Sequence, residues 1–422
     1  MMLVEFRVKN FRSLRDEHVL SLVASRDKTL ADTHTLATGL TAVPRLLKSA
    51  VLYGANASGK SNLIKALLYM RGAVFGSATL PPGQPFAVQP FRLDARSSGL
   101  PSEFEVTFIL EGIRYQYGFA MTQHRIVSEH LLVYKAFKPQ RWFVRRFDET
   151  TGKDVYDFGP GLKGQKNVWE NATRPNALFL SMAVQLNSEA LRPVFDWFAN
   201  KLIICNEQTL VNPQFSIQML KQPDGRKQIL DFLSAADTSL ADIEVVTRKV
   251  PRQTIHFDPT GKTEVRADEV EDDQLFFSHV TDTGQKAVFD FASESAGTRG
   301  LLLFAGPVLD TLRNGRTLVI DELLTSLHTL LMRELVRLFH RPEVNASDAQ
   351  LIFTTHDTSL LDAYGLFRRD QVWFMEKRAD QSSTLYSLLD YSPRKNEALE
   401  RGYLQGRYGA VPILSGNLGL AH

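Results

Sequence analysis

The chain has 422 residues, 44% of them hydrophobic, which is enough to bury a large core and to form about two or three domains. Its 49 Lys and Arg residues nearly balance its 47 Asp and Glu residues. The net charge of +2 excludes a general attraction to nucleic acid, so DNA binding would need a local basic patch.

Cysteine content and apolar runs bear on the location of the protein. The chain has one cysteine, Cys205, so an intrachain disulfide is excluded, and its apolar surroundings predict a buried, inert thiol. No apolar run approaches the roughly 20 residues of a membrane-spanning helix, and the N-terminus reads as a charged strand rather than a signal peptide. These features predict a cytoplasmic protein with no membrane partner.

The N-terminal part of the chain predicts two strands. Residues 3–8 alternate apolar and polar side chains, as a half-buried strand does, and a turn follows at residues 10–13. Residues 28–44 are polar and irregular, which predicts a loop. Residues 50–53 are all apolar or aromatic, which predicts a buried strand that ends in a turn.

The turn after this strand carries the first chemical motif. The sequence GANASGKS at residues 54–61 matches the phosphate-binding pattern G-x-x-x-x-G-K-[ST], here called the P-loop. Its glycines let backbone N–H groups wrap a phosphate, and the following helix directs its positive dipole end at it. Lys60 would reach the β- and γ-phosphates, and the Ser61 hydroxyl would bind Mg²⁺. The candidate nucleotide-contacting residues of this segment are Gly54, Asn56, Gly59, Lys60, Ser61 and Asn62.

The long segment after the P-loop predicts a helix, a linker and then strands. Residues 61–71 read as a helix, and residues 73–85 are rich in Gly, Pro and small side chains, as a linker is. Alternating segments separated by turn residues then predict an antiparallel β-lobe. Its strands are predicted at residues 103–110, 113–121, 126–134 and 142–148.

The middle of the chain predicts a helical lobe and a further β-element. Residues 187–200 and 226–236 have apolar side chains at helical spacing, and residues 245–292 contain polar alternating stretches. Six acids between residues 264 and 273 predict a solvated loop, with a surface for a basic partner as the alternative. The absence of heptad repeats excludes a long coiled coil.

Three further motifs follow in order. Residues 294–298 (ESAGT) would start a helix, whose free N–H groups form an anion site. The apolar strand at residues 317–320 ends in Asp321 and Glu322. Asp321 would hold Mg²⁺ through water, and Glu322 would take a proton from the attacking water.

The last motif is a histidine at a strand end. Residues 350–354 predict a strand, and His356 follows it within the sequence TTHD. Residues 372–376 and 383–388 predict two more strands. The aromatic and glycine-rich residues 402–412 predict either a packed C-terminal cap, which is favoured, or a docking loop near the nucleotide.

The order of these motifs resembles the ABC-type ATPases, and within them the RecF, SMC and OLD branch. In that family the motif holding Ser295 and Gly297 would be the signature, which faces the γ-phosphate bound on the other protomer. His356 resembles the switch histidine that contacts the γ-phosphate and the attacking water. Residues 325–328 look like the family's D-loop but lack its common Asp.

The same resemblance implies two further contacts. A turn like residues 10–13 lies beside the adenine in RecF-like proteins, so Arg12 either contacts the nucleotide or is an ordinary surface arginine. ABC enzymes place a Mg²⁺-contacting glutamine between the β-lobe and the helical lobe. Gln185 lies at that join and is preferred over Gln89, which precedes the β-lobe, with an ordinary surface glutamine as the alternative.

A closer resemblance is to the bacterial RloA and AbiL-type ATP-binding proteins, a group that includes the AriA-like ATPase subunit of PARIS-type defence. It rests on residues 6–13, 178–181 and 402–410. It implies antiphage or restriction-linked work with ATP and Mg²⁺ as cofactors, and a separate effector protein, a nuclease or toxin, as partner.

The predicted fold class is α/β, an ABC-type P-loop ATPase head with an antiparallel β-lobe and a helical insertion. Residues 1–75 would form the N-terminal part of the ATPase core and residues 86–160 the β-lobe. Residues 161–290 would form the helical or mixed insertion lobe, and residues 291–422 the C-terminal part of the core.

The family resemblance implies an ATPase that closes head to tail as a homodimer, or within a higher homo-oligomer, around two ATP molecules. The alternative is a DNA-binding repair ATPase of the RecF or SMC kind. Its basic surface would comprise Arg141, Arg145, Arg146, Lys163 and Lys166. A self-contained nuclease is disfavoured because the chain after His356 is too short for a typical added domain.

Overall fold

The computed structural model describes residues 2–206, 213–235, 240–257, 263–322, 328–392 and 397–412. The chain divides into two compact units. The first comprises Met1–Asn206, Thr311–Thr325 and Met332–His422, and the second comprises Glu207–Asp310 and Ser326–Leu331.

The first unit contains a six-stranded sheet in the order β11-β15-β16-β5-β17-β18. Five strands run parallel, and β18 is antiparallel to β17. Their bounds are β5 (Ser49–Tyr53), β11 (Leu202–Cys205), β15 (Thr317–Ile320), β16 (Gln350–Thr354), β17 (Val372–Lys377) and β18 (Ser383–Ser387). The strands that the sequence predicts in this region are therefore confirmed.

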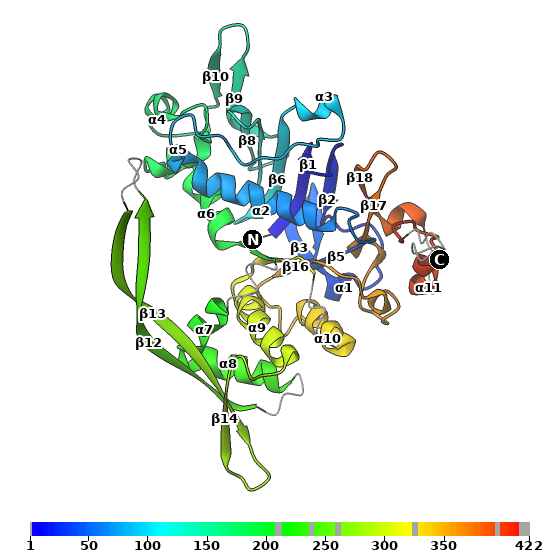
Figure 1. Ribbon diagram of the computed structural model, residues 1–422. Coiled ribbons are helices and arrows are strands. Elements are labelled where there is room, and N and C mark those ends of the chain that lie inside the picture. The colour runs from blue at the N-terminus through cyan, green and yellow to red at the C-terminus, as the bar shows by residue number, and fades with distance from the viewer. Residues whose placement is uncertain are drawn as a thin grey trace, which may run out of the picture. The chain divides into compact units, whose positions relative to one another are not determined.

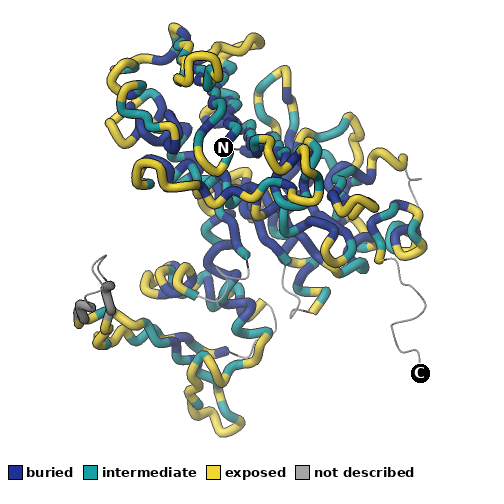
Figure 2. Tube along the Cα trace, turned by 45° about the horizontal axis from the view of Figure 1, so that its top comes forward, coloured by how far each residue is buried: buried dark blue, intermediate teal, exposed yellow. Residues whose placement is uncertain are grey.

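Burial in this sheet follows from its parallel arrangement. Strands β5, β15 and β16 are buried at every position, as parallel strands covered on both faces are. Figure 2 colours buried positions such as these dark blue. Cys205 is also buried, which confirms the prediction, and burial raises the pKa of its thiol to about 12. The segments that follow β5, β15, β16 and β17 meet at one edge of the sheet, because these strands are parallel.

A second sheet of the first unit is antiparallel and has seven strands in the order β10-β9-β8-β7-β6-β1-β2. Their bounds are β1 (Met2–Lys9), β2 (His18–Ser21), β6 (Ser102–Leu110), β7 (Ile113–Met121), β8 (Ile126–Tyr134), β9 (Gln140–Asp148) and β10 (Lys153–Phe158). The four strands predicted between residues 103 and 148 are confirmed. Strand β1 pairs with β6, so the predicted β-lobe is continuous with the N-terminal hairpin.

Helix α2 (Lys60–Gly76) begins at the P-loop and packs on β1, β6, α5 (Phe179–Gln185) and α6 (Arg192–Asn200) (Figure 1). Its buried residues recur at helical spacing, from Leu63 through Leu67 and Met70 to Val74. The predicted linker is wrong in its first part, since α2 continues to Gly76 and the 3₁₀ helix η1 (Ser77–Thr79) follows. Val74 is fully buried, so packing outweighs the loop composition there.

The loop predicted at residues 28–44 is also wrong. This segment contains α1 (Ala31–His34) and β3 (Thr35–Leu40), and β3 pairs with β4 (Val43–Leu47). Leu36, Leu46 and Leu47 are buried at 2% exposure or less. Their burial stabilises a short hairpin that the polar residues around it conceal in the sequence.

A buried ion cluster joins the antiparallel sheet to α5. Arg145 of β9 has no exposed side-chain surface and pairs with Asp154 at 2.8 Å and with Glu129 at 3.7 Å. The Glu129 carboxylate accepts hydrogen bonds from the backbone N–H groups of Phe179 and Leu180 at the start of α5. Arg145 therefore cannot belong to a DNA-binding surface, and that sequence-based assignment is wrong.

The second unit combines helices with a three-stranded antiparallel sheet in the order β12-β13-β14. Its elements are α7 (Gln214–Leu220), α8 (Pro223–Ser234), β12 (Leu240–Phe257), β13 (Thr263–Val280), β14 (Lys286–Asp290) and most of α9 (Ala296–Asn314). Ile229, Leu233, Phe277 and Leu302 belong to its own hydrophobic core. The predicted helix at residues 226–236 and the predicted β-element are confirmed.

The acidic segment of this unit is not the predicted solvated loop. It lies in β13, which is paired with β12 along its length, with Asp272 opposite Arg248 and Glu271 opposite Lys249. Opposite charges across a strand pair are stabilising. The acids therefore complement basic residues of the neighbouring strand.

The remaining helices are short. Their bounds are α3 (Ala95–Ser98), α4 (Lys166–Ala172), α10 (Thr329–His340), α11 (Leu399–Leu404), η2 (Thr358–Leu360), η3 (Arg369–Gln371) and η4 (Leu388–Tyr391). In α11, the ring of Tyr403 stacks on Phe374 at 5.4 Å, so the predicted C-terminal cap is confirmed. Among the described residues, no helix combines the length and the apolar character needed to cross a membrane.

Candidate nucleotide-binding site

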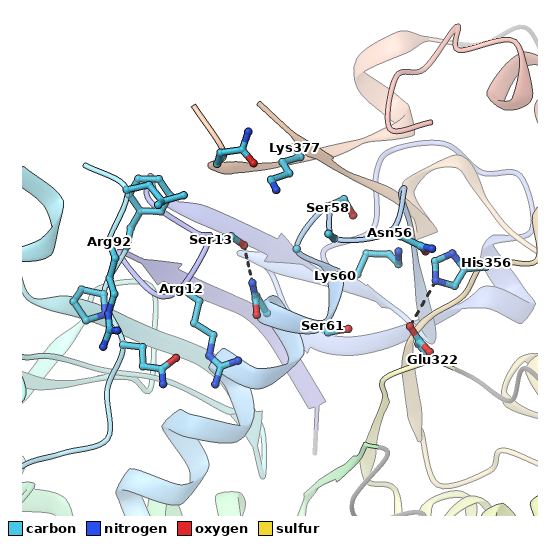
Figure 3. Close-up of a pocket in the computed structure, with 18 residues that line it drawn as sticks. Arg12, Ser13, Asn56, Ser58, Lys60, Ser61, Arg92, Glu322, His356 and Lys377 are labelled. Carbon is cyan, nitrogen blue, oxygen red and sulfur yellow. Dashed lines mark hydrogen bonds and ion pairs between the residues drawn. The ribbon is translucent and has the colours of Figure 1, made fainter. Parts of the chain in front are cut away.

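The first unit has a cavity of about 690 Å³ at the carboxyl edge of its parallel sheet (Figure 3). Three sequence-distant segments and four single residues line it. They are residues 12–13, 56–62 and 89–93, together with Glu322, His356, Lys377 and Gln381. The structure therefore brings the P-loop, one carboxylate after β15 and the histidine after β16 to one place.

The P-loop has a backbone that requires glycine. Gly59 has φ 112°, and a Cβ there would lie 2.2 Å from Ser383 Oγ. A Cβ at Gly54 would lie 2.2 Å from the carbonyl oxygen of Met375. The loop therefore packs closely against Met375 of β17 and Ser383 of β18 only with glycine at both positions.

Lys60 bends back over this loop. Its Nζ donates hydrogen bonds to the carbonyl oxygens of Gly54 at 2.7 Å and Ala55 at 3.2 Å. Burial lowers the pKa of Lys60, while the charges of Glu322 and Asp321 act in the opposite direction. The ammonium group is thus held at the mouth of the loop, where it can exchange carbonyl partners for phosphate oxygens.

Asp321 lies under the start of α2. Its Oδ1 accepts hydrogen bonds from Ser61 Oγ and Thr354 Oγ1, both at 3.1 Å. Burial raises the pKa of the Asp321 carboxyl, and these two hydrogen bonds oppose the rise. A hydroxyl and a carboxylate side by side form the hard oxygen set that Mg²⁺ prefers, so these residues fit that ion.

Glu322 and His356 face the cavity together. The Nε2 atom of His356 lies 3.6 Å from Glu322 Oε1, and both side chains are more than a third exposed (Figure 3). Glu322 has φ 57°, a left-handed conformation that is uncommon outside glycine, and its N–H donates to Thr354 Oγ1 at 2.7 Å. The Thr354 hydroxyl thus orients both acids that follow β15.

Arg12 lies on the side of the cavity away from Glu322 and His356 (Figure 3). Arg12 has φ 51°, and its N–H donates to the carbonyl of Gln89 at 2.7 Å. The Arg12 Nε atom is buried without a hydrogen-bond partner in the described part of the chain. Asn62 donates from Nδ2 to Ser13 Oγ at 2.8 Å. Arg12, Asn56 and Asn62 all line the cavity.

The two glutamines differ in position. Gln89 lines the cavity, whereas Gln185 is the last residue of α5 and is exposed. The other six residues of α5 are buried, so the packing of this helix turns its end toward solvent. Gln185 is not among the described residues that line the cavity.

Ser295 and Gly297 lie in the second unit, at the start of α9. Ser295 Oγ accepts a hydrogen bond from the N–H of Thr298 at 3.0 Å, as a helix N-cap does, and Ser295 is exposed. The D-loop predicted at residues 325–328 lies outside the described residues except for His328.

Sequence reasoning missed several residues of the site. Lys377 ends β17, and Figure 3 shows its side chain extending toward the P-loop. It lines the cavity, as does Arg92, and neither has an ion-pair partner in the described part of the chain. The rule that parallel strands end at one edge could have found Lys377. No local signal marks Arg92.

A second cavity of about 930 Å³ adjoins the first and shares Asn56, His356, Lys377 and Gln381 with it. Tyr403 and Pro412 line it, so the C-terminal segment both packs on the core and borders the site.

Comparison with known proteins gives one family match. A family model described as "AAA domain, putative AbiEii toxin, Type IV TA system" matches residues 49–362. A search of curated proteins gives no match.

Two solved structures extend over most of the chain at low similarity. The SMC head domain from Thermotoga maritima is 12% identical, with a TM-score of 0.40, over 92% of this chain and 99% of that chain. The Smc head domain with an extended coiled coil, bound to the C-terminal domain of ScpA and derived from Pyrococcus furiosus, is 11% identical, with a TM-score of 0.38, over 93% and 98%. Sequence identities and TM-scores this low support no conclusion about function.

Proposed function

The chain belongs to the family of AAA domains of the AbiEii type, and we propose that it binds Mg-ATP in the cavity described above and hydrolyses it to ADP and phosphate. The predicted fold class is confirmed: an α/β, ABC-type P-loop ATPase head with an antiparallel sheet. The observation that carries the proposal is the meeting of Lys60, Glu322 and His356 in one cavity, next to the Ser61–Asp321 pair.

The phosphates would be held by the P-loop. Its N–H groups and the N-terminus of α2 provide the positive end of a helix dipole, and Lys60 adds a full positive charge. Ser61 and Asp321 would hold Mg²⁺, which neutralises phosphate charge when it is bound. Their hydrogen bond at 3.1 Å keeps both oxygens directed at the same place before binding.

Glu322 would act as the general base. Its carboxylate faces the cavity and is more than a third exposed, so a water molecule can reach it. His356 lies beside it and would orient that water by hydrogen bonding. Thr354 fixes the backbone of Glu322, which keeps the base at the end of β15.

For the Mg²⁺-contacting glutamine we propose Gln89 in place of the expected Gln185. Gln89 lines the cavity, and its carbonyl oxygen accepts the N–H of Arg12. Arg12, held beside Gln89 by this backbone hydrogen bond, would contact the nucleotide.

We further propose that two copies close head to tail on ATP, as the resemblance to ABC-type ATPases implies. The support from this chain is the N-terminus of α9, a helix of 19 residues that begins beside the exposed, capping residue Ser295. Ser295 and Gly297 of one copy would face the γ-phosphate bound to the other. A higher homo-oligomer built from such dimers is compatible with this arrangement.

The biological role that we propose is a defence switch, in which ATP-dependent closure controls a separate nuclease or toxin. It is supported by the family match and by the sequence resemblance to RloA and AbiL-type proteins. The alternative is a DNA-binding repair ATPase, and two of the basic residues proposed for its DNA-binding surface do not suit that role. Arg145 is fully buried, and Arg141 pairs with Asp157 at 2.7 Å.

Mass photometry of the purified chain tests the proposed dimer. With Mg-ATP we expect particles of twice 47.6 kDa, and with Mg-ADP or in the Lys60→Ala variant we expect mostly single chains. A mass that stays the same with ATP, while ATP is still hydrolysed, would overturn ATP-dependent closure and leave the ATPase itself standing.

A further inference from the structure

Two serines 370 positions apart meet beside the P-loop. Ser383 is the first residue of β18, and Ser13 lies in the turn after β1. The N–H of Ser383 donates to the carbonyl of Ser13 at 2.8 Å, and their Oγ atoms are 2.8 Å apart. Ser383 Oγ is also 2.6 Å from the carbonyl oxygen of Ser58, a P-loop residue.

The number of protons fixes the direction of these hydrogen bonds. A hydroxyl carries one proton, and the Ser58 carbonyl can only accept, so Ser383 donates its proton there. The contact between the two hydroxyls then has Ser13 as donor. Asn62 Nδ2 in turn donates to Ser13 Oγ at 2.8 Å, and Figure 3 shows this bond. The result is a directed chain from Asn62 through Ser13 and Ser383 to Ser58.

The chain of hydrogen bonds is buried where it touches the P-loop. Ser383 has no exposed surface, and Ser58 is 1% exposed, so water cannot replace a lost partner at the Ser58 carbonyl. Ser383 Oγ also occupies the space beside Gly59, 2.2 Å from where a Cβ would be. One hydroxyl therefore holds the loop by a hydrogen bond and by close packing.

We propose that Ser383 is a positioning residue for nucleotide binding. Its hydroxyl fixes the backbone at Ser58 and Gly59, and through Ser13 it ties the P-loop to the turn that carries Arg12. The two ends of the cavity are thereby held at a set separation before the ligand arrives, which lowers the ordering cost of binding. This inference rests on the proposed function, because it requires that the cavity takes a nucleoside triphosphate.

The position of Ser383 indicates which kinetic constant depends on it. Among the described residues that line the cavity, Ser383 is absent, so it does not touch the reacting atoms. Its loss should weaken nucleotide binding and leave the chemical step nearly unchanged.

The test is a double-mutant cycle on ATP affinity and turnover. For Ser383→Ala we expect Kd and KM for Mg-ATP to rise about tenfold, because that is the effect on affinity of losing one hydrogen bond. We expect kcat to stay within about twofold of the wild-type value. Ser13→Ala should have a similar effect. The double variant should lose little more than either single variant, because both break the same chain of hydrogen bonds.

Ser382→Ala is the matched control. The Ser382 hydroxyl donates to Asp380 Oδ1 at 2.6 Å, within its own turn, so this variant should bind ATP as the wild type does. Melting temperatures without nucleotide are measured for every variant. If Ser383→Ala and Ser13→Ala lower only the melting temperature and keep wild-type affinity, or if their effects on affinity add fully, the positioning role is overturned.

Failure of the Ser383→Ala variant to fold and failure of the wild-type chain to bind ATP have different consequences. If Ser383→Ala fails to fold, Ser13→Ala decides the question by its ATP affinity alone, because Ser13 is only half-buried. A wild-type chain that binds no ATP would instead overturn the proposed function, on which this inference rests.

Discussion

Ser61 Oγ donates a hydrogen bond of 3.1 Å to Asp321 Oδ1, although 260 positions separate the two residues in the sequence. This contact joins the P-loop to the strand end that carries the acids. Thr354 donates to the same oxygen, so three neighbouring parallel strands contribute to one buried polar cluster. Phosphate binding and proton abstraction can therefore be served by one site.

Lys60→Ala should abolish measurable ATP binding at micromolar concentrations. Losing two charge-assisted hydrogen bonds of roughly 1.5 kcal/mol each corresponds to about a hundredfold in Kd. Isothermal titration with Mg-ATP measures the change. Lys153→Ala, which removes an exposed lysine of β10 in the antiparallel sheet, is the control and should bind as the wild type does.

Two glycines, one just before α2 and one within it, should respond in opposite ways to alanine. Gly59→Ala should destroy nucleotide binding, because φ is 112° and the Cβ would meet Ser383 Oγ. At Gly72, in the C-terminal half of α2, a Cβ would meet nothing within 4 Å, so Gly72→Ala should raise the free energy of unfolding. We expect the free energy of unfolding, measured by urea denaturation, to rise by about 0.5–1 kcal/mol, with unchanged ATP affinity. A destabilised Gly72→Ala would contradict this account of the helix.

A stacked histidine pair should make folding sensitive to acid. The rings of His34 and His340 are 3.8 Å apart, both are buried, and Lys48 and Arg368 add positive charge nearby. Burial lowers the pKa of His34 to about 4 and that of His340 well below its usual value. Because the folded-state pKa values are lowered, the stability is fully present above about pH 6.5 and is lost as the pH falls toward 4.

Urea midpoints at pH 5 and pH 7.5 measure this dependence. The His34→Asn variant should show a flatter change in the free energy of unfolding between these values, by at most about 1.4 kcal/mol per pH unit. His124→Asn, at an exposed turn, should keep the wild-type dependence. If the stability of His34→Asn and of the wild type depended equally on pH, His34 would not be a source of the acid sensitivity.

The buried arginine of the antiparallel sheet should be essential for stability. Arg145→Met leaves the Glu129 carboxylate buried without its positive partner, and we expect a loss of about 3–5 kcal/mol in the free energy of unfolding. Arg146→Met changes the exposed neighbour and should cost less than about 0.5 kcal/mol. Chemical denaturation compares the free energies of unfolding of the two variants. Similar losses in both would contradict a stabilising role for the buried ion cluster.

The chemical motifs could be predicted because each is local. A P-loop, an apolar strand that ends in acids and a histidine after a strand can each be recognised within a few residues. Their order along the chain also predicted that they meet, since the ends of parallel strands share an edge. Ser61 and Asp321 are a direct instance.

The supporting residues could not be predicted, because their roles arise only from contacts between distant segments. Ser383 touches Ser13 across 370 positions, and neither belongs to a pattern that specifies the other. The acids of β13 read as a loop because their basic partners lie on β12, and pairing of strands is not visible in one sequence. Gln185 looked suitable by its place in the chain, but the burial of the rest of α5 leaves it exposed.

The most direct test of the central claim is single-turnover ATP hydrolysis by wild type and Glu322→Gln, with ATP affinity measured on the same samples. We expect the variant to bind Mg-ATP with nearly wild-type affinity and to hydrolyse it at least about a hundredfold more slowly, because the general base is removed and the P-loop is intact. An unchanged rate of hydrolysis in Glu322→Gln would contradict the assignment of this cavity as the catalytic site.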